Sequence, residues 1–343
     1  MAAQRWITRH GSKRSGFRYR DARGRPVRDP SVLARIDALR IPPGWHQVHV
    51  AESSRAAVQA WGIDAKGRKQ YRYHARAVQR GEQRKYHRVR GLARDLPAIR
   101  ERVWRDFHGD GLTRERVAAA VVRLIGEGFF RIGSERYARE NRTFGIATMQ
   151  KKHVSVQRNA LIFTYVGKGS IPHRQVVVDA ELARFMDELL QTPGRRLFRY
   201  RASGTWSNLT AREVNEYVRA ITGVRYSAKD FRTWGGTLRV ATVLSDLGPP
   251  ATEREAKRNV VLAVRLVAAE LGNTPAICRK SYVHPIVIAR YLDAGNTIVP
   301  RPVSSAHRPL SIHEPEERAL IHFLDRYFPD RRRQPRPEDL VAA

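Results

Sequence analysis

The sequence predicts an α+β protein, with a small β-rich N-terminal domain followed by a mainly α-helical domain that contains a three-stranded antiparallel sheet. Short runs with period-two alternation gather before residue 75 and again between residues 154 and 178, which is typical of strands. Elsewhere, apolar residues recur at helical spacing over long stretches. A chain of 343 residues is long enough for two domains with separate cores.

The N-terminal part divides into two predicted segments. Residues 1–30 are basic, rich in glycine and weakly patterned, so we expect a loosely ordered arm there. Residues 31–90 are expected to form the small β-rich domain, which ends in a very basic linker from residue 74. A short helix is expected around residues 31–40. Strands at 57–61 and 70–73 flank a turn-rich loop and are expected to form a hairpin.

Residues 91–325 are predicted to form the larger, mainly helical domain, with a flexible tail over residues 326–343. Thr113 begins a helix whose apolar residues lie on one face, and a second, short helix covers residues 135–141. The sheet lies between helical segments, because the period of the pattern changes from 3.6 to two and back. Its expected strands are 154–156, 160–166 and 175–178.

Two capping boxes open later helices, one at Thr210–Glu213 and one at Thr252–Glu255. The helix that follows Thr252 is expected to end at Gly272, because glycine is common just past a helix end. Pro275 then fits the first turn of a new helix, with Tyr282 just past its start.

The charge balance points to a polyanionic partner. Lys and Arg number 64 against 33 Asp and Glu, so the net charge is +31 and the isoelectric point is about 11.3. Arginine accounts for 54 of the 64 cations, and its planar side chain can bind a phosphate through two parallel hydrogen bonds. Double-stranded DNA is therefore the leading candidate partner. A membrane surface fits less well, because we find no basic amphipathic helix with an aromatic side facing lipid.

The remaining composition limits the cofactors and the location. The single cysteine, Cys278, allows no internal disulfide and no cysteine-based zinc site, and the 12 histidines show no metal-ligand spacing. We therefore expect no metal and no other cofactor. The N-terminus lacks the apolar core of a signal peptide, and no run is long enough to span a membrane. A cytoplasmic, nucleoid-associated bacterial protein is the expected setting.

Five residues in separate segments carry the candidate chemistry. Arg131 lies at a break between helices, Lys168 at a turn between strands, and Arg232 early in a helix. Asn273 follows the glycine that ends a long helix, and Tyr282 lies beyond it. A phenol with a pKa near 10 is a weak nucleophile at neutral pH, but fixed cations stabilise both a phenolate and charge on phosphorus. Each residue alone also fits an ordinary role in a turn, a core or a solvated surface.

In order, these segments resemble the active site of the poxvirus-type DNA topoisomerases of type IB, which many bacteria also carry and whose catalytic fold is related to that of tyrosine recombinases. The resemblance runs from about Ile41 to about Asp293. The most specific piece is the run Phe-x-Arg-Ile-Gly-Ser-x-x-Tyr-x-x-Glu-Asn, which begins at Phe129. The other pieces are Gly167-Lys-Gly169, Lys229-x-x-Arg232 and Leu271-Gly-Asn273 followed by Tyr282.

This resemblance implies a role for each residue. Tyr282 would attack phosphorus, form a 3′-phosphotyrosyl link to DNA and release a 5′-hydroxyl. Arg131 and Arg232 would bind the non-bridging phosphate oxygens, and Lys168 would protonate the leaving oxygen. Asn273 stands where the viral pattern has histidine, so it is expected to donate a hydrogen bond and to take no part in proton transfer. Supercoil relaxation of this kind requires neither ATP nor a metal.

The resemblance also suggests residues that contact DNA outside the active site. The viral N-terminal domain has a matching Gln-Tyr-x-Tyr segment that faces the major groove, so Lys69, Gln70, Tyr71 and Tyr73 are candidates, and the small domain would act as one half of a clamp. Tyr137 is a further candidate. For the tyrosines, packing in a core is an equally good interpretation of the sequence.

Two other functions compete with a monomeric topoisomerase. A site-specific tyrosine recombinase uses the same nucleophile, but recombinases typically have histidine where Lys229 stands, and the β-rich N-terminal domain also favours the topoisomerase. A non-enzymatic DNA-binding protein would explain the net charge, but it would not require the ordered set of five residues. Because all five lie on one chain, we expect a monomer to be sufficient.

Overall fold

The structure is a computed structural model, and it describes residues 5–224, 226–301 and 313–329. The chain divides into two compact units, residues 1–85 and residues 86–343. In the part of the chain that the structure describes, no single helix is long and apolar enough to cross a bilayer. Two helices that meet at a bend of 95° pass that test only when they are taken together.

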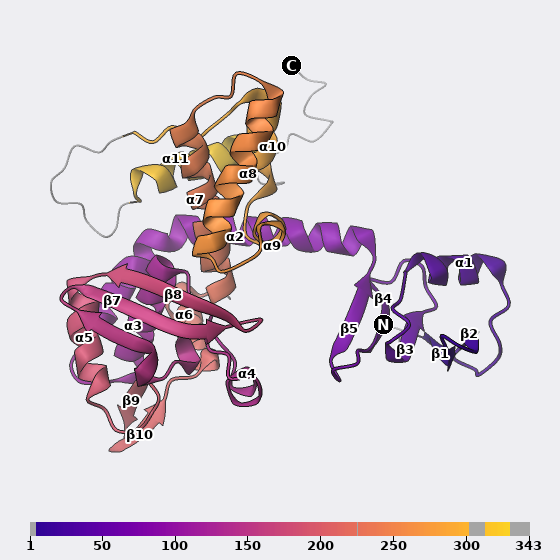
Figure 1. Cartoon of the computed structure of the whole chain (residues 1–343), viewed down its shortest axis with the longest axis horizontal. Coiled ribbons are helices and arrows are strands. Elements are labelled where there is room, and N and C mark those ends of the chain that lie inside the picture. The colour runs from indigo at the N-terminus through magenta and orange to yellow at the C-terminus, as the bar shows by residue number, and fades with distance from the viewer. Residues whose placement is uncertain (1–4, 225, 302–312, 330–343) are drawn as a thin grey trace. The chain divides into compact units, whose positions relative to one another are not determined.

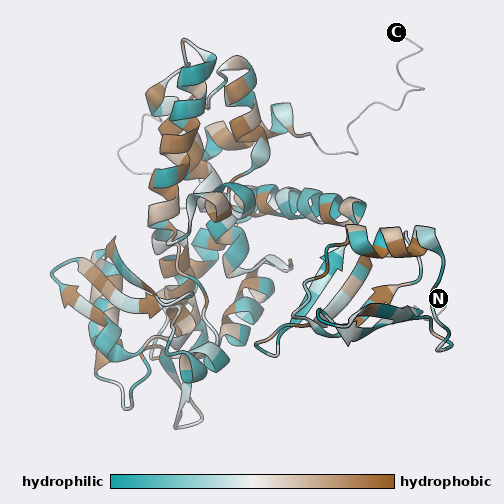
Figure 2. Cartoon of the chain, turned by 45° about the vertical axis from the view of Figure 1, so that its right-hand side comes forward, coloured by the Kyte–Doolittle hydropathy of each residue, from teal (hydrophilic) through white to brown (hydrophobic). Residues whose placement is uncertain are grey.

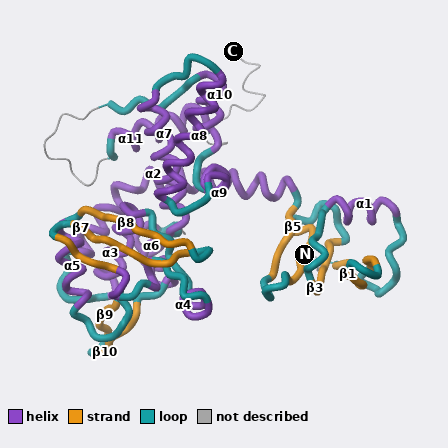
Figure 3. Tube along the Cα trace, viewed as in Figure 1, coloured by secondary structure: helices purple, strands orange, loops and turns teal. Residues whose placement is uncertain are grey.

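The first unit is a five-stranded antiparallel sheet with one short helix packed against it (Figure 3). The strands lie in the order β2-β1-β3-β4-β5. The predicted hairpin is confirmed, because β4 and β5 pair antiparallel. The elements are β1 Trp6–Ser12, β2 Gly16–Arg20, α1 Pro30–Ala38, β3 His46–Ala51, β4 Val58–Ile63 and β5 Lys69–Tyr73.

Helix α1 covers one face of this sheet, and its start follows from local chemistry. The Asp29 side chain accepts a hydrogen bond from the Ser31 amide. Pro30 occupies the first turn, where a backbone N–H would have no partner within the helix, so the missing N–H of proline costs no hydrogen bond. Ile36 is buried against side chains from three strands, which share a face because their positions pair directly across the sheet. These core partners are Ile7, Val48, Val50 and Ala60.

The opposite face of the sheet carries aromatic side chains. Thr8, His49, Trp61 and Tyr71 are aligned across four neighbouring strands, so they point to the same side. The rings of His49 and Trp61 stack at a centroid distance of 4.1 Å. The two faces therefore differ: one is an apolar core under α1, and the other is lined by aromatic groups.

The expectation of a loosely ordered arm over residues 1–30 is wrong for the residues that the structure describes there. Trp6–Ser12 and Gly16–Arg20 are strands of the sheet, joined by a tight turn. The pattern was hidden because only Ile7 of the first strand is fully buried, while His10, Gly11 and Ser12 are polar or small and lie exposed. Residues 1–4 lie outside the described residues.

The basic linker expected from residue 74 is instead the start of a 33-residue helix, α2 Ala75–Phe107. Its first turns are hydrophilic, and the buried stripe begins only at Tyr86 and continues through Val89 and Leu92. The helix runs through Pro97, although proline removes one hydrogen bond of the ladder. Packing of this stripe stabilises a helix that the composition of residues 74–92 did not indicate.

The second unit is mainly helical, as predicted, and one continuous apolar core joins its helices to its sheet. Figure 2 shows long hydrophobic stretches, in brown, on the helices of this unit. Its helices after α2 are α3 Arg114–Gly128, α4 Glu135–Glu140, α5 Ala180–Leu190, α6 Ala211–Thr222, α7 Ala228–Leu247, α8 Glu253–Glu270, α9 Pro275–Ser281, α10 Pro285–Ala294 and α11 Pro315–Tyr327. Short 3₁₀ turns cover Ile146–Thr148 and Lys151–His153.

The embedded three-stranded sheet is confirmed, with order β6-β7-β8 and both pairs antiparallel. Helices α3 and α5 pack against it (Figure 1). Leu161, Phe163 and Tyr165 alternate along the middle strand toward this core, which is the period-two pattern of the sequence. The strands are β6 Val154–Gln157, β7 Ala160–Gly167 and β8 Ile171–Val178, with a separate hairpin of β9 Arg199–Ala202 and β10 Thr205–Asn208.

The expected helix starts are also found. Thr113 caps α3, and the Thr210 hydroxyl accepts from the Glu213 amide while the Glu213 carboxylate accepts from the Thr210 amide. At α8 only half of the predicted box forms: Thr252 accepts from the Glu255 amide, but the Glu255 carboxylate binds the Ala251 amide. Helix α11 ends at Tyr327, so the predicted flexible tail over residues 326–343 begins too early, because residues 326 and 327 are helical. Residues 330–343 of that tail lie outside the described residues.

Candidate active site

Arg131 is held by an extended segment that follows α3. The segment runs beside residues 145–147, because the amides of Ile146 and Ala147 donate to the carbonyls of Arg131 and Ile132 at 2.8 and 2.9 Å. Two glycines allow this close approach. A Cβ on Gly133 would lie 2.7 Å from the Thr148 hydroxyl, and one on Gly145 would lie 2.5 Å from the Arg131 carbonyl oxygen. The glycine of the Arg-Ile-Gly motif is therefore needed to place Arg131.

The end of α8 supplies two backbone carbonyls to the site. Gly272 has a φ of 58°, and its amide donates to the Ala269 carbonyl at 3.0 Å while the Asn273 amide donates to the Ala268 carbonyl at 2.9 Å. This is the glycine-based Schellman ending, which satisfies the last helix carbonyls inside the helix. The next carbonyls along the chain, those of Leu271 and Gly272, remain available as acceptors for side chains.

Both arginines bind this helix end. Arg131 Nη2 donates to the Gly272 carbonyl at 2.7 Å and to Asn273 Oδ1 at 2.6 Å. Arg232 Nη2 donates to the Leu271 carbonyl at 2.8 Å, and its Nη1 donates to the Phe129 carbonyl. The negative end of a helix favours cations, so α8 holds two guanidinium groups side by side despite their like charge.

Arg232 is 3% exposed, which is unusual for arginine. Burial lowers the pKa of its guanidinium and the charge of Arg131 lowers it further, whereas Tyr282 opposes these two effects. Arginine nevertheless stays charged in proteins. The centre of the guanidinium lies 5.1 Å from the centroid of the Tyr282 ring, so a fixed cation stands directly beside the candidate nucleophile.

Two consecutive glycines inside α7 let the helix approach its neighbours. A Cβ on Gly235 would overlap the Phe129 ring, and one on Gly236 would lie 2.8 Å from the Tyr282 carbonyl oxygen. Glycine inside a helix costs about 0.5–1 kcal/mol relative to alanine. The close packing that the two glycines allow offsets this loss of helix stability, and it brings Arg232 of the same helix close to Tyr282.

Tyr282 lies at the C-terminal end of the short helix α9, not just past the start of a long one as the sequence suggested. Its amide donates to the Cys278 carbonyl at 2.9 Å, and α10 begins three residues later, at Pro285. The break follows from His284-Pro285, because proline disfavours a helical residue before it. Tyr282 is half-buried and packs against the apolar core.

The structure thus brings four of the five predicted residues together, and it leaves one apart. Lys168 lies in the exposed turn between β7 and β8, where Gly169 has a φ of 80°. No hydrogen bond or ion pair joins its ammonium to the other four residues among those that the structure describes.

Two buried donors at this cluster have no hydrogen-bond partner among the described residues: Asn273 Nδ2 and Arg232 Nε. Buried polar atoms almost always have a partner in a folded protein, so each such atom needs an explanation. Both belong to residues that were predicted to bind phosphate oxygens. No group of three or more His, Cys, Asp or Glu side chains that could hold a metal occurs among the described residues.

The candidate DNA-contact residues of the first unit have distinct surroundings. Tyr71 and Tyr73 are 41% and 53% exposed, and their rings stack at 5.8 Å, so neither is a core residue. Lys69 Nζ lies 3.8 Å from the centroid of the Trp61 ring. Gln70 is only half-buried, but its amide donates to Asp64 Oδ2 at 2.9 Å within the same hairpin.

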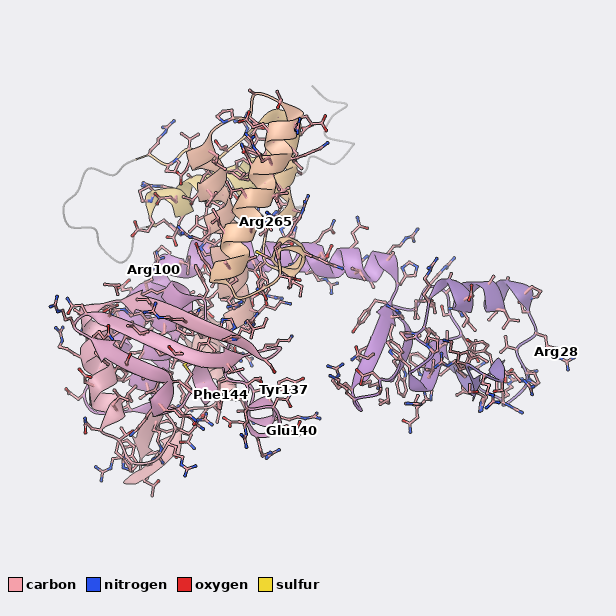
Figure 4. The ribbon with its side chains drawn as sticks, viewed as in Figure 1. Arg28, Arg100, Tyr137, Glu140, Phe144 and Arg265 are labelled. Carbon is pink, nitrogen blue, oxygen red and sulfur yellow. The ribbon has the colours of Figure 1, made fainter. Side chains whose placement is uncertain are left out.

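Tyr137, which Figure 4 labels, lies on α4, the short helix that follows Arg131 in the chain. Its side chain is 46% exposed, so core packing does not explain this tyrosine. Together with Tyr71 and Tyr73, it remains available for contact with a ligand.

Sequence reasoning missed His173 and the pair Gly235–Gly236. His173 on β8 is half-buried and lies 3.5 Å from Arg131, but a single histidine in a strand gave no signal. The two glycines did give a signal, because consecutive glycines inside a helical pattern indicate close packing against a neighbouring segment.

Two known protein families match this chain. Residues 74–298 match the family described as "Eukaryotic DNA topoisomerase I, catalytic core", which covers every residue of the cluster. Residues 16–64 match the family described as "Bacterial DNA topoisomerase IB, N-terminal domain". The second match includes strands of the first unit.

Individual relatives point the same way. DNA topoisomerase 1B of Acanthamoeba polyphaga mimivirus is 30% identical over 267 residues, which cover 76% of this chain and 80% of the relative. DNA topoisomerase 1B of Vaccinia virus (strain Copenhagen) is 25% identical over 245 residues, 68% of this chain and 72% of the relative. DNA topoisomerase 1 of rabbit fibroma virus is 28% identical over 250 residues, with 69% and 73% covered. This chain therefore belongs to the type IB DNA topoisomerase family.

Proposed function

We propose that this enzyme relaxes supercoiled duplex DNA by cutting one strand through a 3′-phosphotyrosyl intermediate on Tyr282 and then resealing it. Between the two steps, the duplex rotates about the intact strand and releases torsional strain. The covalent link keeps the energy of the phosphodiester bond, so the cycle needs no ATP. All the proposed residues lie on one chain, so a monomer is sufficient.

The two unpartnered buried donors are the observation that carries this proposal. Asn273 Nδ2 and Arg232 Nε are closed off from solvent, and neither has an acceptor among the described residues. The Arg232 guanidinium lies beside the Tyr282 ring, and Asn273 Oδ1 accepts a hydrogen bond from Arg131. A phosphate oxygen is the acceptor that both would suit, because it is anionic and accepts several bonds. The cluster is then complementary to a phosphodiester bound next to the tyrosine.

In the proposed cleavage step, the Tyr282 phenol gives up its proton to solvent, and its oxygen forms a bond to phosphorus while the bond from phosphorus to the 5′ oxygen breaks. Arg131, Arg232 and Asn273 donate hydrogen bonds to the non-bridging oxygens, where negative charge gathers in the transition state. The guanidinium groups need not reorganise, because backbone carbonyls already hold them. They supply positive charge of the kind that divalent metals supply in other phosphoryl-transfer enzymes.

Lys168 is the proposed general acid. The departing 5′ oxygen takes the electron pair of the broken bond and needs a proton, because an alkoxide is a poor leaving group. The ammonium of Lys168 would give that proton, and it would take one back when the 5′-hydroxyl attacks the phosphotyrosine. The exposed hairpin turn leaves Lys168 free to meet DNA that covers the cluster.

The test is relaxation of supercoiled plasmid in EDTA without ATP, with the wild type beside Tyr282→Phe. We expect relaxation and a denaturant-resistant protein–DNA adduct with the wild type alone. If the wild type binds plasmid but changes neither linking number nor covalent state, the proposal fails. Activity confined to DNA with paired recombination sites would favour a recombinase instead. Relaxation by Tyr282→Phe would show that Tyr282 is not the nucleophile.

A further inference from the structure

We propose that His173 is a positioning residue that sets the distance between the turn carrying Lys168 and the phosphate-binding group made by Arg131 and Asn273. This inference rests on the proposed function. It gives a role to a residue that is not among the five proposed catalytic residues. It concerns placement, since His173 itself need not touch DNA.

His173 fills the space between two backbone segments. A Cβ built on Gly167 would lie 2.5 Å from His173 Cδ2 and 2.6 Å from Nε2, so the ring lies directly against the backbone of that glycine. A Cβ built on Gly272 would overlap the other edge of the ring. Gly167 directly precedes Lys168, and Gly272 directly precedes Asn273. The imidazole therefore acts as a spacer between the two parts of the site.

The ring is held in place from its face and from its edge. Tyr165, its partner across the β7–β8 pair, stacks on it with centroids 5.1 Å apart and planes at 16°. The Tyr165 hydroxyl donates to Gln175 Oε1 at 2.6 Å, which fixes the tyrosine in turn. At the edge, Arg131 Nη1 lies 3.5 Å from His173 Nε2.

The contact with Arg131 indicates a neutral imidazole. Arginine only donates, so Nε2 must be the acceptor, and the proton lies on Nδ1. Burial lowers the pKa of His173, and the charges of Arg131 and Arg232 lower it further. Three other titratable groups lie around His173. One is the phenol of Tyr165, and burial raises the pKa of this phenol to about 12. The others are the carboxylates of Glu127 and Glu270, which line the same cavity as His173.

The same contact limits where Arg131 can point. Its Nη2 is occupied by the Gly272 carbonyl and Asn273 Oδ1, and one N–H of Nη1 faces His173. These contacts do not use the Nε–H or the second N–H of Nη1. Removing the imidazole would free both the guanidinium and the hairpin turn, and a displacement of about 1 Å can cost about 10²-fold in rate.

The first test compares leaving groups in single-turnover cleavage of one duplex. One substrate has the ordinary 5′ oxygen at the cleaved bond, and the other has sulfur there, which leaves as a thiolate and needs no general acid. We expect His173→Ala to slow cleavage of the oxygen substrate about 10- to 100-fold and to slow the sulfur substrate much less. Val178→Ala, at a 76% exposed position on the same strand, is the matched control and should alter neither rate.

The outcomes separate this inference from the proposed function. If His173→Ala slows both substrates by the same factor, the imidazole does not place Lys168 and the inference is overturned. If the wild type forms no adduct with either substrate, the proposed function itself fails. If Lys168→Ala also shows no preference for sulfur, the general acid has been misassigned and the inference falls with it.

The second test uses Gly167→Ala, because the added methyl group would press against His173. Gly167 does not have a positive φ, so the backbone accepts alanine and the effect comes from the contact. We expect Gly167→Ala to slow cleavage of the oxygen substrate, and the double variant Gly167→Ala/His173→Ala to be slowed by much less than the product of the two single effects. Independent effects that multiply would show that the two residues do not act through their contact.

Discussion

Tyr71 and Tyr73 of the first unit lie exposed on the sheet, and the ammonium of Lys69 is exposed beside the Trp61 ring. In the second unit, Arg232 is almost fully buried, and backbone carbonyls hold both its terminal nitrogens. The same two kinds of group, aromatic rings and cations, therefore appear in opposite environments. One region presents them to solvent, and the other encloses them.

This difference separates binding from chemistry. Exposed charges act through water and are screened by salt over about 10 Å, so they favour encounter and loose contact with DNA. Buried charges interact more strongly, and because they are already oriented they need no rearrangement in the transition state. We therefore expect changes in the first unit to alter DNA affinity and changes in the cluster to alter the cleavage rate.

The largest expected effect comes from Arg232→Ala. One well-placed arginine is worth about 10³–10⁵ in phosphoryl-transfer rate, so cleavage at saturating DNA should fall by that order. Single-turnover kinetics would measure it, beside DNA affinity from a binding titration. The control is Arg265→Ala, an exposed arginine on α8 that Figure 4 labels. An equal loss of rate in both variants would contradict the distinction between buried and exposed cations.

The second effect comes from Gly236→Ala. Alanine is the better helix former, but its methyl group would lie 2.8 Å from the Tyr282 carbonyl oxygen and must displace that segment. We expect cleavage to fall about 10- to 100-fold with little change in DNA affinity. Gly126→Ala is the matched control, because a Cβ there on α3 meets nothing within 4 Å. If both variants cleave like the wild type, Tyr282 is not placed through α7.

A third, smaller effect is expected from the double variant Tyr71→Ala/Tyr73→Ala. Removing two stacked, exposed rings should weaken DNA binding about tenfold, which corresponds to about 1.4 kcal/mol, and should alter the rate at saturating DNA far less. A titration with labelled duplex checks the affinity. Leu33→Ala on α1, the helix that covers the other face of the sheet, serves as the control. Unchanged affinity in the double variant would remove these tyrosines from the DNA-binding surface.

The smallest effect concerns pH. Burial lowers the pKa of His153 and of His173, so the unfolded chain takes up protons that the folded chain resists. Stability from these groups is therefore complete above the unfolded pKa of about 6.5, and it is lost as the pH falls from there through the lower folded pKa values. Thermal unfolding at pH 7.5 and pH 5.5 would test this. His153→Gln/His173→Gln should lose less stability between the two pH values than the wild type, and an equal loss would contradict the assignment.

The sequence predicted the parts of the fold that carry strong local patterns. The three strands of the embedded sheet and the caps at Thr113 and Thr210 depend on residues close together in the chain. The first two strands and the part of α2 over residues 75–92 were missed. The two strands bury few of their residues, and the buried stripe of α2 begins only at Tyr86 and packs against distant partners. Local composition does not record such partners.

The candidate site also has parts that the sequence predicts and parts that it does not. Arg131, Arg232, Asn273 and Tyr282 could be chosen from their ordered motifs, and the structure brings them together. That grouping depends on the Schellman ending of α8, where the carbonyls of Leu271 and Gly272 accept hydrogen bonds from the two arginines. No single sequence motif predicts these contacts. His173 was invisible because its role comes from contacts with two glycines in other elements.

The most direct test of the separation between binding and chemistry is to vary salt and measure affinity and cleavage on the same duplex. The account predicts that raising salt from about 50 to about 200 mM weakens DNA binding by several orders of magnitude. It also predicts that the cleavage rate of the preformed complex, held at saturating DNA, changes by less than about threefold, because Arg232 is buried and backbone carbonyls hold both arginines that bind the phosphate. A cleavage rate at saturation that falls in step with the affinity would contradict the account.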